Sequence, residues 1–278
     1  MGGPGFLGVL GWPLNSTLSP VIHRAAFGAL GIPWAYLAWP MPPERLAAAI
    51  EGLRALGAVG ANVTMPHKEP VMELLDEVSA EARSLGAVNT ISRVGESLVG
   101  HNTDVAGFSA SLHQSGVDIS GRSALVLGAG GAARGVVRAL EQMGANDIVV
   151  CARRPEAAAA VAGLADNVQA MAWERRQEAC KAAALVVNAT PLSAVGGDPL
   201  SGARFGPGQV VVDLVYVPAE TELLRRARAE GAQAVGGLGM LVNQAAASLR
   251  IWTGLEPPLG VMERAAMASG GEATMESI

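Results

Sequence analysis

The sequence predicts an α/β protein of two domains, on the basis of three observations. The chain has 278 residues, which is longer than most single domains and favours two. Half of the residues are hydrophobic but only 4% are aromatic, so the core should be aliphatic. Short apolar runs alternate with amphipathic segments of helical period, which is the pattern of parallel βαβ sheets.

The first half of the chain alternates predicted strands and helices. Residues 6–10 form a short apolar run that predicts a buried strand. Ser19 and Pro20 predict an N-cap followed by proline at the first helical position, with the helix running to Gly31. We expect this parallel alternation to repeat up to about Thr103. The elements predicted in between are a strand at 34–39, a helix at 43–56 and a strand at 59–63.

The second half opens with a continuous apolar strand at 123–127, followed at once by a glycine-rich turn and a helix. The later apolar runs are nearly continuous, which suits strands covered on both faces. After Gly239 the pattern becomes helical to Trp252, with a last helix beyond Pro258 and a polar, frayed tail at 270–278. The other predicted strands lie at 147–151, 185–187, 210–212 and 233–235.

Composition argues against several kinds of partner. The net charge is −5 with no cluster of basic residues, so no nucleic-acid partner is expected. No apolar run reaches the ~18 residues of a membrane span, and the first 18 residues do not resemble a signal peptide. Two cysteines, Cys151 and Cys180, make neither a disulfide framework nor a metal site. We therefore expect a reduced, cytoplasmic protein without a membrane partner or a metal.

Residues 128–133 match the GxGxxA fingerprint of dinucleotide-binding folds, directly after a strand and at the start of a helix. Gly128 permits the tight turn, Gly130 lets the backbone approach a pyrophosphate, and the helix N-terminus offers amide donors. The alternative is a glycine- and alanine-rich structural turn, and the flanking elements favour the nucleotide site. Backbone contacts to the cofactor are expected from Gly128, Ala129, Gly130, Gly131 and Ala132.

The end of the next strand indicates which dinucleotide is bound. NAD enzymes place a carboxylate there for the ribose 2′-hydroxyl. Here the strand runs into Arg153 and Arg154, with no carboxylate before Glu156. Guanidinium groups suit a 2′-phosphate, so the sequence predicts NADP. A solvated arginine pair is the alternative, although arginine is unfavourable at a helix N-terminus.

Polar side chains in the first half follow predicted strands at the edge where ligands bind. Asn62, Thr64 and Lys68 come just past one strand, and Asn89 and Asp104 lie beside similar ones. Strand carboxyl ends line the ligand crevice of an open α/β sheet. Hydroxyls and amides suit a polyhydroxylated ligand, while an amine and a carboxylate suit proton transfer. Taken singly, each residue could instead be a turn residue, a solvated lysine or a helix-start acid.

These strings resemble the shikimate dehydrogenase family over nearly the whole chain, in both order and spacing. The resemblance implies a substrate-binding domain at 1–105, completed by C-terminal helices at 239–278. It also implies a Rossmann-like NADP-binding domain at 106–238. The implied reaction is the reversible NADP-dependent reduction of 3-dehydroshikimate to shikimate. The matching motifs lie at 18–23, 62–68, 86–90, 102–107, 128–133, 188–191, 213–218, 237–244 and 252–254.

The resemblance also assigns roles to single residues. Lys68 and Asp104 are the implied catalytic pair, with Lys68 stabilising or protonating the carbonyl oxygen and Asp104 orienting the amine. Tyr216 is implied to close the substrate pocket. The other implied substrate binders are Thr17, Ser19, Asn62, Thr64, Asn89 and Gln244. The implied cofactor contacts beyond the glycine turn are Arg153, Arg154, Asn188, Thr190, Val215, Gly237 and Met240.

Four positions depart from the usual family pattern, namely Thr17, Ala152, Ser193 and Gly236. None removes a catalytic group, but they leave substrate preference and cofactor affinity open. Quinate as substrate or NAD as cofactor is an alternative within the family. Outside it, a methylene-tetrahydrofolate-type dehydrogenase would not predict Asp104 or Tyr216, and a non-catalytic regulator would be expected to lose the catalytic pair. The sequence does not fix the oligomeric state and is compatible with a homodimer.

Overall fold

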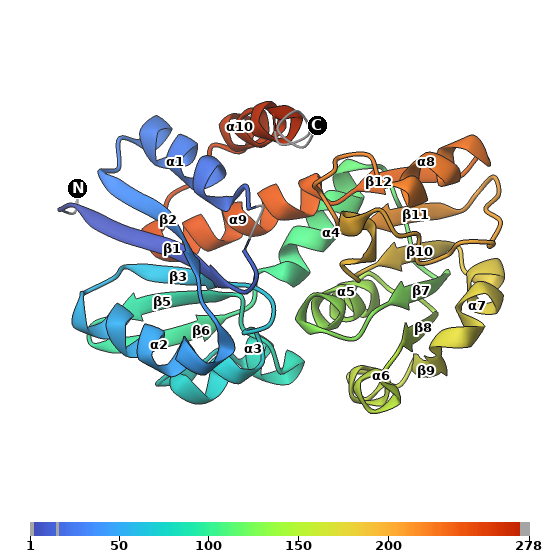
Figure 1. Ribbon diagram of the computed structural model, residues 1–278, viewed down its shortest axis with the longest axis horizontal. Coiled ribbons are helices and arrows are strands. Elements are labelled where there is room, and N and C mark those ends of the chain that lie inside the picture. The colour runs from blue at the N-terminus through green and yellow to red at the C-terminus, as the bar shows by residue number, and fades with distance from the viewer. Residues whose placement is uncertain (1–2, 15–16, 273–278) are drawn as a thin grey trace. The chain divides into compact units, whose positions relative to one another are not determined.

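The computed structural model describes residues 3–14 and 17–272. Of the frayed tail predicted at 270–278, residues 270–272 instead belong to the last helix (Leu259–Glu272), and the rest lies outside the described residues. The chain divides into two compact units, one of residues 1–107 with 242–272 and one of residues 108–241. Each unit is a six-stranded sheet flanked by helices (Figure 1). The α/β fold class predicted from the sequence is confirmed.

The sheet of unit 1 has the order β2-β1-β3-β5-β6-β4. β1 pairs in parallel with both β2 and β3 through continuous apolar runs. β5 then pairs antiparallel with β3 and with β6, while β4 returns parallel to β6. The strands are β1 (Gly5–Gly11), β2 (Trp34–Pro40), β3 (Gly60–Val63), β4 (Glu77–Val78), β5 (Thr90–Val94) and β6 (Ser97–His101).

The mixed sheet corrects one expectation, since the parallel alternation does not continue to Thr103. β5 and β6 form a hairpin, and Gly95 in its turn has a φ of 62°. A glycine is favoured there because other residues are strained at positive φ. The hairpin reverses the chain, and because Thr90 pairs with His101, Asn89 and Asn102 lie just beyond the same end of its two strands.

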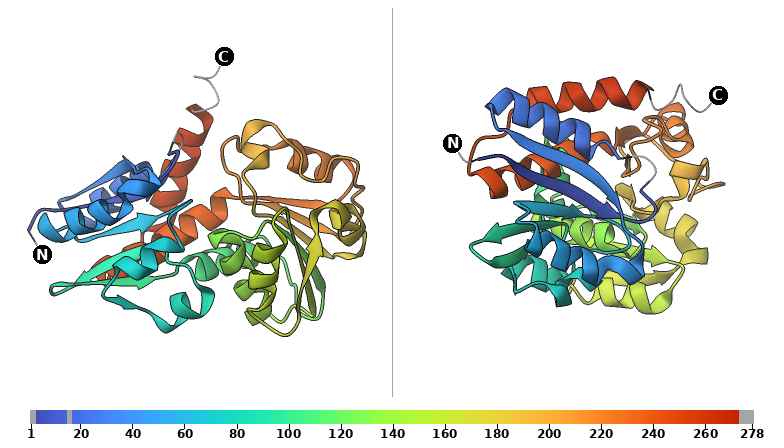
Figure 2. Two further views of the ribbon diagram at one scale, coloured as in Figure 1. Left: turned by 60° about the horizontal axis from the view of Figure 1, so that its bottom comes forward. Right: turned by 60° about the vertical axis from the view of Figure 1, so that its left-hand side comes forward.

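The helices of unit 1 cover both faces of its sheet. α2 and α3 pack on one face, where Ile50, Leu53 and Ala82 join the core, and α1, α9 and α10 lie on the other (Figures 1 and 2). The bounds are α1 (Ser19–Leu30), α2 (Leu46–Ala55), α3 (Ala80–Leu85), α9 (Leu238–Thr253) and α10 (Leu259–Glu272), with 3-10 turns η1 (Pro43–Arg45) and η2 (Pro70–Leu74).

Two helix boundaries differ from the prediction. Ser19 is the first residue of α1 rather than its N-cap, which is Leu18 without a side-chain cap. The Oγ1 atom of Thr17 instead accepts a hydrogen bond of 3.3 Å from the backbone N–H of Ser19. The single helix expected at 43–56 is divided into the 3-10 turn η1 and the helix α2.

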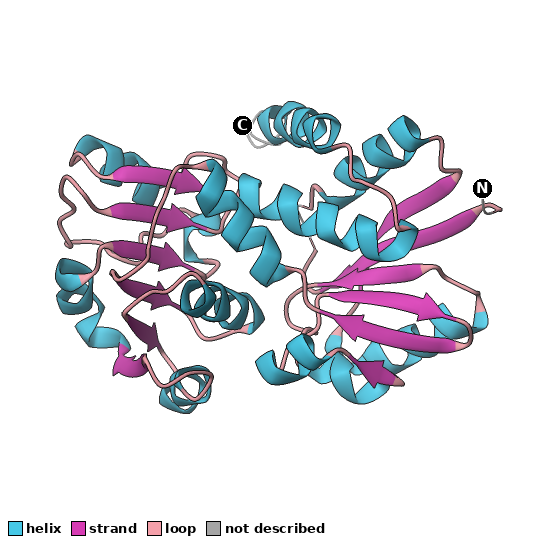
Figure 3. Ribbon diagram, turned by 180° about the vertical axis from the view of Figure 1, so that it is seen from behind, coloured by secondary structure: helices cyan, strands magenta, loops and turns pink. Residues whose placement is uncertain are grey.

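Unit 2 is a doubly wound sheet whose strands run parallel, with helices beside them (Figure 3). The strand order is β12-β11-β10-β7-β8-β9. This is the strand order of dinucleotide-binding folds, with the reversal between β7 and β10. The edge strand β9 was not predicted, because its apolar run is short and interrupted by Gln169, and most of its residues are exposed. The strands are β7 (Ser123–Leu127), β8 (Asp147–Ala152), β9 (Val168–Ala172), β10 (Leu185–Asn188), β11 (Val210–Asp213) and β12 (Gln233–Gly236).

The helices of unit 2 lie on both faces of that sheet (Figure 1). α7 and α8 share one aliphatic core cluster with β7, β10 and β11. Among the described residues, no helix is both long and apolar enough to cross a membrane. The helices are α4 (Asp104–Gln114), which begins in unit 1, α5 (Gly131–Gln142), α6 (Pro155–Ala162), α7 (Arg176–Ala182) and α8 (Glu222–Ala229), with 3-10 turns η3 (Trp173–Arg175) and η4 (Leu192–Val195).

Candidate active site

Lys68 and Asp104 meet in unit 1, although they are 36 residues apart in sequence. Lys68 follows β3, and its carbonyl accepts a 2.8 Å hydrogen bond from the Val88 amide, which fixes its backbone. Asp104 is the first residue of α4, where the helix dipole favours a carboxylate. The Nζ atom of Lys68 lies 2.6 Å from Oδ2 of Asp104, and the side chains are 14% and 4% exposed. The pair is therefore a shielded amine and carboxylate in direct contact.

Asn89 orients the second oxygen of that carboxylate. Its Nδ2 donates to Oδ1 of Asp104 at 2.9 Å, and its Oδ1 accepts from the backbone N–H of Thr103 at 2.8 Å. Asn102 adds a bond from the other side, because its Oδ1 accepts from the Asp104 amide at 2.9 Å. Each carboxylate oxygen of Asp104 thus has its own donor, so its orientation is set before any ligand arrives.

Asn62 is the centre of a second, fully internal network. Its Oδ1 accepts a 2.6 Å hydrogen bond from the Tyr36 hydroxyl. Its Nδ2 lies within 3.0–3.1 Å of the Asn89 carbonyl and of the hydroxyls of Thr90 and Ser248. The side chain is buried. A substrate contact at Asn62 would therefore have to replace one of these bonds.

Thr64 differs from Asn62, because its hydroxyl has no hydrogen-bond partner among the residues that the structure describes. A Cβ atom on Gly11 would lie 2.4 Å from Cγ2 of Thr64, so the glycine makes room for that methyl group. The packing holds the Thr64 methyl toward Gly11, which leaves the hydroxyl as the available group. Gln244 lies nearby, with its Oε1 3.4 Å from Nδ2 of Asn89.

Several residues of this site were not singled out from the sequence. They are Tyr36, Thr90, Thr103 and Ser248, all buried hydroxyl groups of the Asn62 and Asn89 networks. Two signals could have found them. Tyr36 is a polar group in an otherwise apolar strand, and Ser248 lies one helical turn after Gln244, on the same face of α9.

An aromatic cluster lies beneath the Asn62 network. The ring of His23 stacks on Tyr36 at 4.3 Å between centroids and lies 5.2 Å from the ring of Trp252. His23 is fully buried. Burial lowers the pKa of His23 to about 3, with the nearby Asn62 amide opposing the shift. The imidazole is therefore neutral at physiological pH and acts as a packing group.

The glycine turn of unit 2 has the geometry expected of a phosphate-binding loop. Gly128 has a φ of 110°, and a Cβ there would meet the Ala189 carbonyl oxygen at 3.0 Å. A Cβ on Gly130, the N-cap of α5, would instead meet no described atom within 4 Å. The space at Gly130 is therefore open at the start of α5, whose first-turn amides have no acceptor within the helix. These residues fit the pyrophosphate of a dinucleotide.

Arg153 and Arg154 directly follow β8 and are both exposed. Neither side chain has a hydrogen-bond or ion-pair partner within the described parts of the chain. Most other arginines of unit 2, such as Arg226, have such partners. Two unpartnered guanidinium groups at the end of the second strand fit a ribose 2′-phosphate.

The remaining predicted cofactor residues lie at or just after the ends of β10, β11 and β12, except Met240, which lies in the first turn of α9. Asn188 uses its Oδ1 to accept from the backbone N–H of Thr190 at 3.0 Å. Its Nδ2 donates to Asp213 at 2.9 Å and to the hydroxyl of Ser193 at 3.1 Å. Ser193, which departs from the usual family pattern, therefore helps to hold the loop after β10. A Cβ on Gly237 would lie 2.2 Å from the Leu214 carbonyl oxygen. Val215 and Tyr216 are half-buried, and Met240 is buried.

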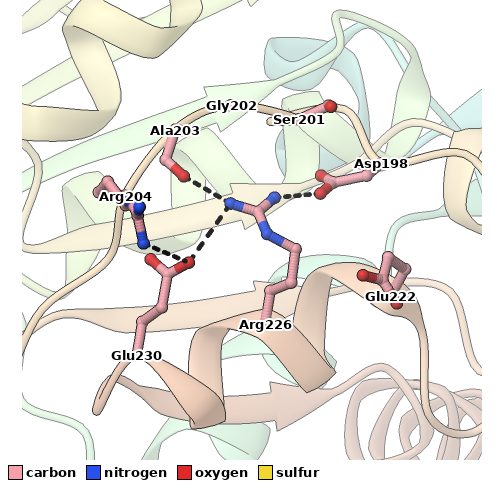
Figure 4. A pocket seen from close by; sticks show the side chains of 8 residues that line it. All are labelled: Asp198, Ser201, Gly202, Ala203, Arg204, Glu222, Arg226 and Glu230. Carbon is pink, nitrogen blue, oxygen red and sulfur yellow. Dashed lines mark hydrogen bonds and ion pairs between the residues drawn. The ribbon is translucent and has the colours of Figure 1, made fainter.

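A surface cavity of about 440 Å³ lies elsewhere in unit 2 and contains none of the predicted site residues. Arg226 fills its centre and reaches Asp198, the Ala203 carbonyl at 2.5 Å and Glu230 at 3.7 Å (Figure 4). These contacts tie α8 to the loop before β11. The cavity is therefore the surface of a structural ion-pair cluster.

The chain has a doubly wound sheet with a glycine turn, which fits a dinucleotide, and a shielded Lys–Asp pair, which fits proton transfer. Together these features define a dinucleotide-dependent oxidoreductase. Family models match three stretches of the chain. They describe the shikimate dehydrogenase substrate binding domain at 9–91, shikimate / quinate 5-dehydrogenase at 111–195 and the shikimate 5′-dehydrogenase C-terminal domain at 237–267. The chain belongs to the shikimate dehydrogenase family, as its motifs predicted.

Relatives and solved structures agree over nearly the whole length. Shikimate dehydrogenase (NADP(+)) of Moorella thermoacetica is 44% identical over 270 residues, covering 94% of this chain and 92% of that protein. Shikimate dehydrogenase (NADP(+)) of Salinibacter ruber is 47% identical, and the match covers 88% of this chain and 90% of that protein. The Thermus thermophilus enzyme in complex with NADP(H) and shikimate has a TM-score of 0.84 at 39% identity, covering 95% and 99%. Quinate dehydrogenase of Corynebacterium glutamicum in complex with NAD has a TM-score of 0.86 at 32% identity, and the match covers 96% of this chain and 100% of that chain.

Proposed function

We propose that this chain catalyses the reversible NADP-dependent reduction of 3-dehydroshikimate to shikimate. The contact between Lys68 and Asp104, with Nζ and Oδ2 2.6 Å apart in a shielded position, is the observation on which the proposal rests. Names of close relatives support the choice of substrate and cofactor.

The Lys68 ammonium is the group that we assign to the reacting carbonyl oxygen. Reduction places negative charge on that oxygen, and a nearby ammonium stabilises the charge and delivers a proton to it. Asp104 holds the amine through Oδ2, and Asn89 holds Asp104 through Oδ1. The side chain of Lys68 is 14% exposed, so the amine can regain its proton from solvent. In the reverse direction the amine accepts the proton of the substrate hydroxyl.

The cofactor that the family implies fits the residues of unit 2. We assign the 2′-phosphate to Arg153 and Arg154, because both are exposed and unpartnered within the described residues. The pyrophosphate is assigned to the amides around Gly130, where a side chain is absent and the space is open. When bound, NADPH supplies the hydride. The other residues assigned to this site are Asn188, Thr190, Val215, Gly237 and Met240.

Substrate recognition is assigned to side chains of unit 1 and to Tyr216. Thr64 is the strongest candidate, since its hydroxyl has no partner within the described chain. Asn89 and Gln244 lie beside Asp104 and can contact the same ligand. For Asn62, the four internal contacts favour a positioning role over direct binding. Thr17 and Ser19, at the start of α1, complete the assignment.

Quinate is the second candidate substrate. The observation that favours it is the close similarity to the Corynebacterium glutamicum quinate dehydrogenase. Thr17 bears on this choice, because its methyl group takes space that the usual serine leaves open. Under this alternative, NAD could also replace NADP, which the two arginines at the end of β8 oppose.

We further propose that unit 1 is the substrate-binding domain and unit 2 the NADP-binding domain. Both cysteines are free and buried, and burial raises the pKa of each thiol to about 11. Unreactive thiols are compatible with the cytoplasmic location proposed from the sequence. A homodimer remains the proposed assembly, and sedimentation of the purified chain tests it.

A spectrophotometric assay of the purified chain tests the proposed function. The four pairs of shikimate or quinate with NADP or NAD are compared by reduced-nucleotide absorbance. We expect the highest kcat/KM for shikimate with NADP. A higher kcat/KM for quinate would select the second candidate, and no turnover with any pair would overturn both.

A further inference from the structure

Asp213, the last residue of β11, is a fully buried carboxylate outside the proposed catalytic pair. Three donors from different segments point at it. Its Oδ1 accepts from Nδ2 of Asn188 at 2.9 Å and from the Val215 amide at 3.1 Å. Its Oδ2 accepts from the Thr221 hydroxyl at 2.8 Å. A buried carboxylate is costly without such donors, so all three segments are held around this one group.

The contact with Asn188 fixes which way that amide faces. A carboxylate only accepts hydrogen bonds, so it receives the NH₂ end of Asn188 and turns the carbonyl end away. That Oδ1 then accepts from both the amide of Thr190, at 3.0 Å, and its hydroxyl, at 2.6 Å. Asp213 therefore sets the conformation of the β10 loop through Asn188 without contacting Thr190 itself.

The loops held in this way lie against the glycine turn. The Ala189 carbonyl, between Asn188 and Thr190, is the atom that a Cβ on Gly128 would meet at 3.0 Å. On the other side, a Cβ on Gly237 would come within 3.0 Å of the Asp213 carbonyl oxygen. The loops that follow β7, β10, β11 and β12 are thus packed together with no room for a side chain at Gly128 or Gly237, and Asp213 joins two of these loops.

The sheet order indicates which half of a dinucleotide these loops would face. In a doubly wound sheet each half binds one mononucleotide. Arg153 marks the half formed by β7, β8 and β9 as the one for the phosphorylated ribose. The loops joined by Asp213 belong to β10 and β11, in the other half, which serves the nicotinamide end.

We propose that Asp213 is a positioning residue of the cofactor site, whose carboxylate holds Asn188, Thr190 and the backbone of Val215 for the nicotinamide half. The inference rests on the proposed function, because it concerns how an NADP site is shaped. Asp213 touches neither cofactor nor substrate in this proposal. Its loss should therefore weaken NADP and NAD equally, whereas loss of Arg153 should weaken NADP alone.

The test measures NADP and NAD dissociation constants of the full chain by titration calorimetry, for wild type, Asp213→Asn and Asp213→Ala. Asp213→Asn places an NH₂ group against one of the three donors. We expect both affinities to fall about 10-fold in Asp213→Asn and about 10- to 100-fold in Asp213→Ala, with their ratio unchanged. Shikimate binding to the cofactor-free protein should stay at the wild-type value.

Leu223→Ala is the matched control for loss of stability, since Leu223 is a fully buried core residue of α8. It should lower the unfolding midpoint while leaving cofactor binding intact. Wild-type affinities in Asp213→Asn, a loss confined to NADP, or an equal loss in Leu223→Ala at matched stability would each overturn the inference. If Asp213→Ala fails to fold, the NADP and NAD affinities of Asp213→Asn alone decide whether the inference holds. Failure of the wild type itself to bind NADP would overturn the proposed function instead.

Discussion

The two units prepare their proposed sites in opposite ways. In unit 1 the proposed catalytic pair and the amides that support it are bonded to one another, so that both carboxylate oxygens of Asp104 and both side-chain polar atoms of Asn62 have protein partners. In unit 2 the side chains assigned to the 2′-phosphate of the cofactor have no partners among the described residues. Arg153 and Arg154 are exposed, and the space over Gly130 is open.

The difference follows from what each site has to do. Proton transfer needs an amine and a carboxylate held at a fixed position, and a network of buried hydrogen bonds supplies that rigidity. Phosphate binding needs unsatisfied donors and positive charge, which the ligand itself then satisfies. Mutations of these bonded groups of unit 1 should therefore act on turnover or stability, and mutations at the arginines of unit 2 should act on cofactor affinity.

The largest effect is expected for the catalytic pair. Lys68→Ala and Asp104→Asn should each lower kcat by about 100- to 10,000-fold, because acid–base assistance is lost. The two residues act on one oxygen, so the double variant should be little worse than the worse single variant. Shikimate affinity should fall less than kcat, because the hydroxyl and amide contacts remain. Steady-state kinetics and equilibrium binding measure the two quantities separately.

An exposed ion pair of unit 1 provides the matched control. Arg54 and Asp76 also form an ion pair, but outside the proposed site. Arg54→Ala should leave kcat unchanged. Near-normal turnover in a Lys68→Ala variant with a native circular dichroism spectrum would refute the proposed mechanism.

The second effect concerns affinity for the cofactor. Arg153→Ala should weaken NADP binding by about 10- to 100-fold and leave NAD binding nearly unchanged, because a charge-assisted contact to the 2′-phosphate is lost. Arg204→Ala is the control, since Arg204 is an 88% exposed arginine of the same unit. Titration calorimetry measures both affinities. If Arg153→Ala weakened NADP and NAD binding equally, Arg153 would not contact the 2′-phosphate.

The contrast also shows how far the sequence could predict this protein. Strands with continuous apolar runs were placed to within about a residue, as for β7, because burial on both faces leaves a clear signal. The exposed edge strand β9 has no such signal and was missed. The direction of β6 depends on a hairpin at Gly95, a local turn that overrides the alternation of strands and helices around it.

For the sites, the predicted residues were those with recognisable motifs, while the residues that support them were not. Asp104 and Asn89 belong to short motifs, whereas Tyr36 and Ser248 lie 26 and 186 residues from Asn62 in sequence. Only the folded sheet brings such hydroxyls together. A polar group that serves another side chain of the protein therefore needs the structure to reveal it.

The third effect distinguishes Thr64 from Asn62, two neighbouring residues that were both predicted from the sequence to bind the substrate. Thr64→Val keeps the side-chain shape and removes a hydroxyl without a described partner, so it should raise the shikimate dissociation constant by about 5- to 100-fold at unchanged stability. Asn62→Ala should instead lower the free energy of unfolding by about 1–3 kcal/mol, because Tyr36 and Ser248 lose their partner. Denaturant titration and shikimate binding of both variants give the comparison. The reverse outcome would show that Asn62 contacts the ligand and Thr64 does not.

The smallest effect is a difference in how the units respond to pH. In unit 1, burial lowers the pKa of His23 to about 3, from 6.5. Protons then bind the unfolded chain better, so stability is complete above about pH 6.5 and falls as the pH drops toward 3. In unit 2, burial raises the pKa of Cys151 and Cys180 from 9.0 to about 11. The two neutral thiols therefore contribute fully to the stability of the folded state below pH 9. That contribution is lost as the pH rises toward 11, because the unfolded chain releases these protons more readily.

His23→Phe tests the acid limb, because phenylalanine keeps a ring against Tyr36 and cannot be protonated. Between pH 7 and pH 5, where carboxylates stay ionised, wild type should lose about 2 kcal/mol of unfolding free energy, at about 1.4 kcal/mol per pH unit below 6.5. His23→Phe should lose much less, while His113→Gln, at an exposed position on α4, should behave as wild type. Urea denaturation at the two pH values measures the difference. An equal loss in wild type and His23→Phe would show that the buried imidazole does not control the acid stability of unit 1.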